Sequence, residues 1–326
     1  MNLLKAIFSL IKETIGEYVK DRGTIYAAGL AYYGVFSIAP LLVFATAVAG
    51  RFIGRGAAGE QVALQLQFLV GPELAVFLED LITTLTDRTT NATAALLSIG
   101  VLLFTAGGIF NQLKTALNLL WGLTDVRPRN AHEWRVLVRY RAIPFLMVFV
   151  LGLFLSLSVI LETLILAVSA RFEVLFPELA GLLPGLSRII VPILAFVTIL
   201  LIFKFLPNAY SRVRDIAVGA AVTTALFLIG RRLLLVFLSI SDTGSLYGAA
   251  GSIVILLVWV YVSAQILLFG AEFTWVYARR FGKPIRPNRL ARFLVNDEPA
   301  VLPPPDSRPP SVDRPPADDR PQIVDK

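Results

Sequence analysis

The chain has 326 residues, of which 56% are hydrophobic and only 16% are charged, and its formal net charge is +7. Soluble globular proteins usually carry about 25% charged residues, so this composition is typical of a membrane protein instead. The absence of cysteine and the single histidine exclude disulfides, thiolate metal sites and multi-histidine metal sites in this sequence.

The N-terminal segment is predicted to form an amphipathic helix. Apolar residues recur there at helical spacing, at Leu4, Ile7, Phe8, Ile11, Ile15 and Tyr18. Charged residues lie between them, and the segment lacks both the continuous apolar core and the cleavage site of a signal peptide. We therefore expect residues 1–26 to lie on the cytoplasmic surface of a membrane.

Six segments have the length and apolar character of membrane spans. A helix rises about 1.5 Å per residue, so crossing about 30 Å of hydrocarbon takes about 20 residues. The candidates are residues 27–50, 89–113, 142–170, 189–206, 216–240 and 243–271. The sequence thus predicts an all-α, polytopic integral membrane protein with six transmembrane helices in residues 27–282. A further amphipathic pattern from Leu74 to Leu85 predicts an interfacial helix between the first two spans.

The distribution of lysine and arginine predicts how the spans are oriented. These residues gather before the first span, in the second and fourth loops, and after the sixth span, whereas the other loops carry few. Because cytoplasmic loops are enriched in basic residues, both termini are expected to be cytoplasmic. The positive net charge is therefore interpreted as a topology signal, and no nucleic-acid partner is predicted.

The C-terminal segment differs sharply in composition from the spans. Nine prolines fall among the last 28 residues, and Arg308, Arg314 and Arg320 are each followed by proline. Residues 283–326 are predicted to be a basic, Pro-rich, disordered cytoplasmic tail. Two interpretations stay open, a linker or a docking segment for envelope protein partners.

Polar residues inside the spans are the candidates for a substrate path, because ionisable groups are costly in hydrocarbon. Counting from the span ends places Glu162, Arg231 and Arg232 in the outer half of the membrane. The inner half holds the second group, Gln265, Glu272 and Lys204.

Each group has two interpretations. The arginines match the phosphate of a lipid headgroup, or they extend to the outer surface because the fifth span ends near Ile229. The inner residues form a polar network, or they are ordinary anchors at the membrane interface.

The motifs of common enzyme classes are absent from the sequence. It contains no phosphate-binding Gly-x-x-x-x-Gly-Lys-Ser/Thr loop, no Gly-x-Ser-x-Gly elbow and no His-Glu-x-x-His pair. The second loop offers only Asp125, His132 and Glu133, fewer ligands than a two-metal hydrolase uses. We predict no catalytic residues, no metal ion and no cofactor.

An ordered set of short motifs runs through residues 5–285. These motifs are Arg22-Gly23, Ala27-Ala28-Gly29-Leu30-Ala31-Tyr32-Tyr33, Phe36-Ser37, Pro40-Leu41, Trp121-Gly122, Gly219-Ala220, Tyr247-Gly248, Trp259 with Tyr261, and Gly270-Ala271-Glu272. Their order and spacing resemble the YihY/BrkB (virulence factor BrkB) membrane family, historically mislabelled ribonuclease BN. The resemblance implies a multi-pass protein of the bacterial inner membrane with cytoplasmic termini.

Three functional hypotheses follow. The first is a non-enzymatic transporter or lipid-handling protein of the cell envelope, whose partners are membrane lipids and whose polar path uses the residues named above. The second is a structural or scaffolding membrane subunit. The third is the tRNA-processing ribonuclease of the family's old label, for which the sequence offers only the basic stretch from Arg127 to Arg141.

Overall fold

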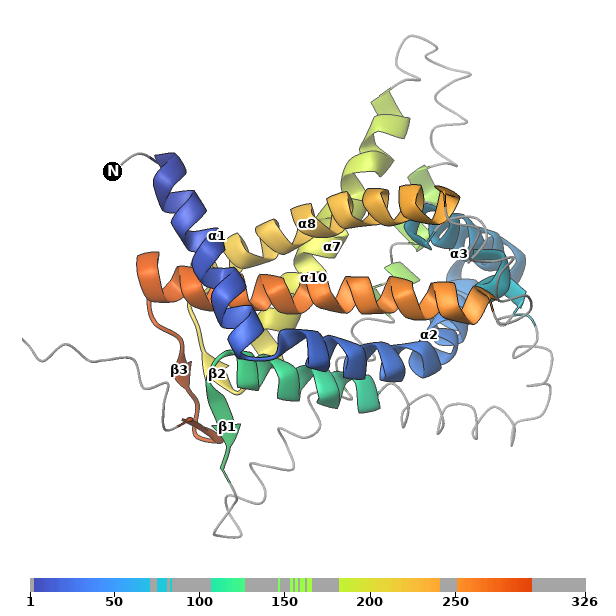
Figure 1. The fold of residues 1–326 in the computed structure, drawn as a ribbon. Coiled ribbons are helices and arrows are strands. Elements are labelled where there is room, and N and C mark those ends of the chain that lie inside the picture. Colours follow the sequence, from blue (N-terminus) through green and yellow to red (C-terminus); the bar gives the residue numbers. More distant parts are fainter. Residues whose placement is uncertain are drawn as a thin grey trace, which may run out of the picture.

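The computed structural model describes residues 3–70, 75–80, 83, 107–126, 146, 153–154, 156–157, 159–161, 163–165, 182–240 and 251–294. The described chain is mainly helical (Figure 1). Its long helices are α1 (Leu3–Lys20), α2 (Gly23–Ile53), α3 (Arg55–Val70), α7 (Leu182–Phe205), α8 (Val213–Ile240) and α10 (Gly251–Phe281), together with a helix over residues 107–120.

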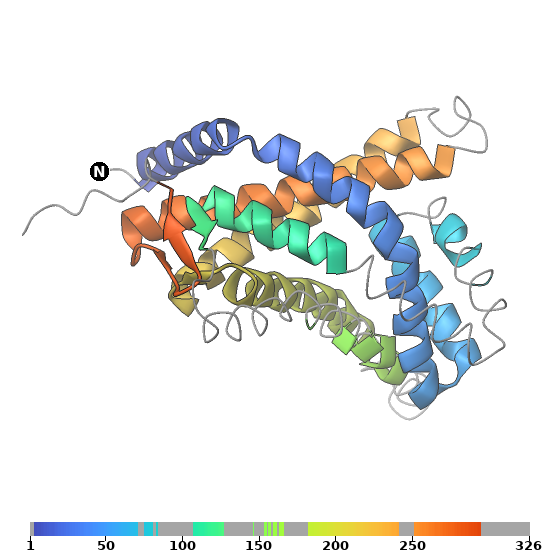
Figure 2. The ribbon, with the colours of Figure 1, turned by 90° about the horizontal axis from the view of Figure 1, so that it is seen from below.

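Helix α10 is the centre of the bundle. It packs against α1, α2 and α8, while α7 packs on α8 and α3 on α2. Figure 1 shows α10 between α8 and α2, and Figure 2 shows the 107–120 helix beside them. The N-terminal helices α1 and α2 and the later helix α8 thus all contact one central helix.

Two of the described helices are long and apolar enough to cross a membrane, Val213–Phe237 and Ile253–Phe281. A third results if α2 is one span, because its axis turns by 45° between Ile38 and Leu41 (Figure 2). Pro40 lies at this bend, and proline cannot donate the backbone hydrogen bond that keeps a helix straight. The apolar helix Pro192–Phe205 is shorter.

These helices confirm a helical membrane protein, and the number of six spans stays a prediction. The predicted spans 89–113 and 142–170 fall largely outside the described residues. The sixth span is predicted to end at residue 271, but α10 continues to Phe281.

Close contact between α8 and α10 depends on two reciprocal glycine–threonine pairs. A Cβ on Gly219 would overlap the side chain of Thr274, and a Cβ on Gly270 would overlap that of Thr223. Each threonine donates its hydroxyl to a carbonyl of its own helix at 2.7 Å, so neither needs a partner across the interface. The helices therefore approach through small residues, as membrane helices commonly do.

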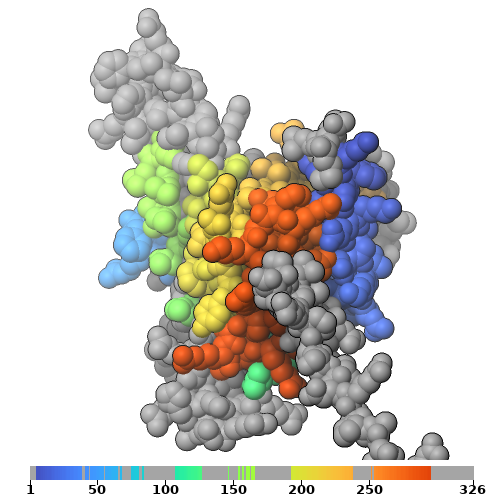
Figure 3. All heavy atoms as spheres, turned by 90° about the vertical axis from the view of Figure 1, so that its left-hand side faces the viewer, coloured from blue at the N-terminus to red at the C-terminus, as the bar shows by residue number. Residues whose placement is uncertain are grey.

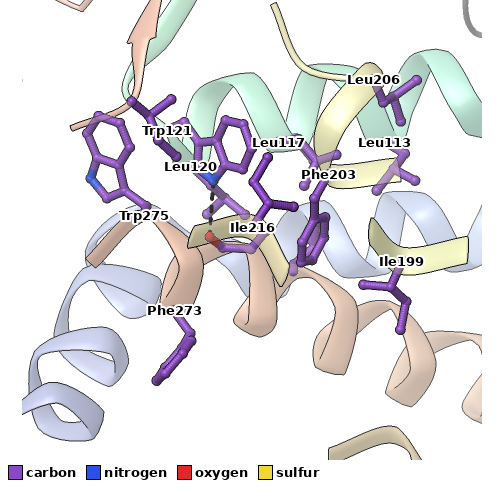
Figure 4. Close-up of a cluster of buried hydrophobic side chains, with 14 of the residues drawn as sticks. Leu113, Leu117, Leu120, Trp121, Ile199, Phe203, Leu206, Ile216, Phe273 and Trp275 are labelled. Atoms are coloured by element: carbon purple, nitrogen blue, oxygen red, sulfur yellow. Dashed lines mark hydrogen bonds between the residues drawn. The ribbon is translucent and has the colours of Figure 1, made fainter. Parts of the chain in front are cut away.

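The principal hydrophobic core lies where the 107–120 helix, α7, α8 and α10 converge (Figure 4). Trp121 is fully buried there beside Phe203 and Ile216. Its indole Nε1 donates to the carbonyl oxygen of Ala271 at 3.0 Å, so the one polar group of the buried ring has a hydrogen-bond partner. This bond anchors the end of the 107–120 helix on α10.

Two small antiparallel sheets close this end of the bundle, and they are short additions to the helical fold that the sequence predicts. Strand β1 (Leu123–Asp125) pairs with β4 (Ala291–Phe293), and β2 (Ala209–Tyr210) pairs with β3 (Arg286–Pro287). The partners are more than 70 residues apart in the sequence and too short to show a strand period. The prediction that the disordered tail starts at residue 283 is wrong, because β3 and β4 form within residues 286–293 and Ile285 is buried.

Helix α1 forms where the amphipathic pattern predicts it, but its apolar residues serve two surfaces. Leu10, Thr14 and Tyr18 follow at intervals of four and form a buried face. A second set is exposed roughly a quarter turn around the helix. This exposed apolar set consists of Ile7, Phe8, Ile11, Ile15 and Val19.

Candidate functional site

A polar stripe runs along the face of α10 that α1 covers. It consists of Tyr261, Gln265 and Glu272, whose spacing of four and seven residues places them on one side of the helix. Gln265 donates from Nε2 to the Tyr261 hydroxyl at 2.6 Å, and the Tyr18 hydroxyl of α1 donates to Gln265 Oε1. Two of the predicted path residues, Gln265 and Glu272, therefore share one site, which we call the α10 stripe.

Glu272 is the unusual member of the α10 stripe. Its side chain is fully buried, and among the described residues neither carboxyl oxygen has a hydrogen-bond partner. Burying an ionised carboxylate without a partner costs far more than burying a neutral polar group. Glu272 thus differs from Glu13 and Glu17, whose carboxylates are partly exposed and paired with Arg279.

Helix α1 packs over the α10 stripe, and the chain then turns sharply into α2. The turn passes through Arg22, whose φ of 55° lies in the left-handed region that few non-glycine residues adopt. The next residue must be glycine, since a Cβ at Gly23 would overlap the ring of Tyr18. The turn thereby presses Tyr18 against α10, where its ring also meets Phe269 edge-on at 5.8 Å.

Ion pairs tie the outer edge of α1 to the end of α10. Arg279 contacts Glu13 at 2.7 Å and Glu17 at 3.4 Å. Arg280 contacts Ser9 at 2.7 Å and Glu13 at 3.4 Å. Figure 3 looks onto this end, where α10 and the following strands lie between α1 and the yellow residues of α7 and α8. Half-exposed pairs of this kind each contribute about 0–1 kcal/mol.

The pKa values of two α1 residues reflect this packing. Burial raises the pKa of Tyr18 well above its ordinary value, and its neighbours Tyr261 and Glu272 raise it further, so its hydroxyl remains a donor. Burial alone would raise the pKa of Glu17, but hydrogen bonds and charge from Lys20 and Arg279 outweigh it and lower that pKa.

The predicted arginines lie on α8, further from the sheets. The helix does not end near Ile229 but continues to Ile240, so both arginines are inside it. Arg231 is half-buried and Arg232 is exposed. The exposed face that carries Arg232 is otherwise apolar, with Ile229, Leu233, Val236 and Phe237. Arg231 lies 18 residues beyond Val213, which is about 27 Å along the helix.

Lys204 belongs to a separate polar assembly at the sheets. Its Nζ donates to the Ser211 carbonyl at 2.6 Å. Nearby, Asp125 Oδ1 accepts from Asn118 at 3.2 Å and from Asn208 at 2.8 Å. These bonds satisfy buried groups where the strands meet the helices, so the assembly is structural. The predicted inner network is thus divided, with Gln265 and Glu272 on the α10 stripe and Lys204 here.

The remaining predicted residues are not placed. Glu162, His132 and Glu133 lie outside the described residues, so contact between Glu162 and the arginines stays a prediction. Within the part of the chain that is described, no group of three or more His, Asp or Glu side chains could hold a metal ion.

Two residues of the site were missed from the sequence. Tyr18 was interpreted only as an apolar member of the N-terminal pattern, although its hydroxyl reaches Gln265. Tyr261 carried a usable signal, because it precedes Gln265 by four residues and so shares its helix face.

Comparison with known proteins gives a consistent family assignment. Residues 14–293 match the family model described as virulence factor BrkB, and the match ends at the last residue of β4. The chain is 28% identical over 273 residues to a UPF0761 membrane protein of Alteromonas mediterranea, covering 81% of this chain and 87% of that relative. A UPF0761 membrane protein of Aeromonas salmonicida is 26% identical and covers 78% and 83%. No solved structure matches the chain.

Proposed function

The chain belongs to the virulence factor BrkB family. We propose that it is a non-enzymatic, multi-pass protein of the bacterial inner membrane that binds and moves a phosphate-bearing envelope lipid. The observation that carries the proposal is the exposure of Arg232 on an apolar face of a helix that is long and apolar enough to cross a membrane. Such a residue is costly in hydrocarbon unless a ligand or water compensates its charge.

The surroundings of Arg232 favour a lipid as this ligand. Exposed apolar side chains precede and follow it on the same face, at Ile229, Leu233, Val236 and Phe237. Acyl chains can pack on these residues while the guanidinium holds a phosphate, whose oxygens it matches in a bidentate geometry. The two ends of an amphiphile are thereby accommodated by one helix face.

Arg231 supports the same ligand from the neighbouring position. Adjacent residues point about 100° apart around a helix, so Arg231 is turned toward the bundle while Arg232 faces outward. Two positive charges side by side repel each other, and a shared anionic headgroup would relieve that repulsion. A phosphate passing from the surface of α8 into the bundle would meet the two guanidinium groups in turn.

The experiment is lipid movement in reconstituted liposomes. A headgroup-labelled phosphatidylglycerol is quenched from outside by a reducing agent that does not cross the bilayer, and the rate at which inner-leaflet lipid becomes accessible is measured. The protein should accelerate this rate, and Arg231→Leu/Arg232→Leu should return it to that of empty liposomes. A double variant as fast as the wild type, or a wild type as slow as empty liposomes, contradicts the proposal.

The matched control is Arg212→Leu/Arg214→Leu. It removes two exposed arginines from the same region of sequence, just before and within the start of α8, so the net charge falls equally. We expect it to insert normally and to retain lipid movement.

A further inference from the structure

We propose that Glu272 is a proton-binding site, a neutral carboxylic acid sealed beneath α1 that ionises only when α1 separates from α10. The proton site on α10 is separate from Arg231 and Arg232 on α8, and this proposal does not require that the protein moves lipid. Its observational basis is a fully buried carboxyl group with no hydrogen-bond partner among the described residues.

Two side-chain donors beside Glu272 on the described residues are bonded to other acceptors. The single hydroxyl hydrogen of Tyr18 goes to Gln265, and Trp121 Nε1 donates to the carbonyl of the adjacent Ala271. A carboxylate buried among committed donors is unstable, whereas a carboxylic acid carries no charge to compensate.

The charged groups that face Glu272 come from α1, the turn after it, and α10 itself. They are Glu17, Lys20, Asp21 and Arg279, with Tyr18 as the titratable neighbour. The two cations are bonded to other carboxylates, Lys20 to Glu17 at 3.1 Å and Arg279 to Glu13 and Glu17. Their charge is thus largely neutralised at the surface, and the two acidic neighbours oppose a negative charge on Glu272.

Release of the proton requires α1 to move. When the O–H bond of the acid breaks, the proton passes to water and the electron pair remains on the carboxylate. That carboxylate needs water around it, and α1 with the buried residues Leu10, Thr14 and Tyr18 excludes water from this face. Occupancy by the proton and docking of α1 are therefore coupled.

The absence of native cysteine allows a direct test. Thr14 is fully buried on α1, so the rate at which a maleimide modifies a Thr14→Cys thiol reports separation of α1. The rate is measured against pH in two backgrounds, the otherwise native protein and Glu272→Gln, whose neutral amide imitates the acid. Because thiol ionisation affects both equally, the ratio of the two rates isolates Glu272.

The ratio of the native rate to the Glu272→Gln rate should be near one below about pH 4, where a water-exposed glutamic acid is also protonated. Above that pH it should rise by up to about tenfold per pH unit, because separation of α1 then releases one proton. A ratio that stays flat overturns the proposal. A second measurement does not rely on the variant folding. The infrared spectrum of the wild type at neutral pH should contain the C=O stretch of a protonated carboxyl group, and a wild type without it overturns the proposal as well.

In that spectrum Glu272→Gln should remove the band, while the exposed α3 control Glu60→Gln should leave it in place. Persistence of the band in Glu272→Gln would assign the proton to another carboxyl and overturn the proposal. None of these readouts requires lipid movement, so failure of the proposed function and failure of the proton site remain distinguishable.

Discussion

Tyr18 donates its hydroxyl to Oε1 of Gln265, which joins the N-terminal helix to the central helix across 247 positions of sequence. The bond fixes α1 over the α10 stripe, because Gln265 is itself held through Nε2 by Tyr261. The N-terminal helix is thereby bonded directly to a polar face of the central helix.

Replacing Tyr18 with Phe should destabilise the protein by about 0.5–1.5 kcal/mol, since it leaves the half-buried Gln265 Oε1 without its donor. Removing both partners in Tyr18→Phe/Gln265→Leu should cost less than the sum of the two single changes. The free energy of unfolding in a denaturing detergent titration measures this. Strictly additive costs would show that the bond contributes nothing.

The turn between α1 and α2 predicts opposite effects for two glycines. Gly23→Ala should lower stability by about 1–3 kcal/mol, because the new methyl group overlaps the ring of Tyr18. Gly16→Ala, inside α1 and with nothing within 4 Å of its Cβ position, should raise stability by about 0.5–1 kcal/mol. Thermal unfolding in mild detergent compares them. Equal shifts for both would rule out the contact with Tyr18 as the cause.

The contact between α8 and α10 predicts a loss that a second change rescues. Gly270→Ala should destabilise by about 1–3 kcal/mol, because its methyl group meets Thr223. Adding Thr223→Ala should restore most of the unfolding free energy by clearing that space. Gly59→Ala in α3, with nothing within 4 Å of its Cβ position, is the comparison without a clash and should raise stability by about 0.5–1 kcal/mol. A double variant no better than Gly270→Ala would contradict this packing.

The lowered pKa of Glu17 predicts how acid acts on α1. A carboxyl group whose pKa is lower in the folded protein stabilises the fold above its unfolded pKa, about 4.3, and loses this effect as pH falls through the folded value. Modification of the Thr14→Cys thiol, relative to the unfolded protein, should therefore rise below about pH 4. In Glu17→Gln the relative rate should already be higher at neutral pH and depend less on acid. An identical acid response in both would exclude Glu17 as the anchor.

Local sequence patterns were sufficient for the helices. The apolar runs that overlap α8 and α10 are predicted correctly as helices. A chain in hydrocarbon must satisfy its backbone hydrogen bonds internally, and a single segment can do so only as a helix. The helical period of α1 can likewise be identified from nearby residues alone. Arg231, Arg232, Gln265 and Glu272 could also be predicted as candidates, because a charged or amide side chain within an apolar run is rare.

Tertiary structure alone decided what those residues contact. Nothing near Gln265 in the sequence indicates Tyr18, and nothing near Glu272 indicates that α1 excludes water from it. The β1–β4 pairing of Leu123 with Phe293 is equally invisible, because such short strands have no period and their register depends on where α10 ends. The sequence by itself determined which segments form long apolar helices, because apolar character and helical period are summed residue by residue along the chain. Which side chains meet there depended on distant helices packing together, because burial and hydrogen bonding are properties of pairs.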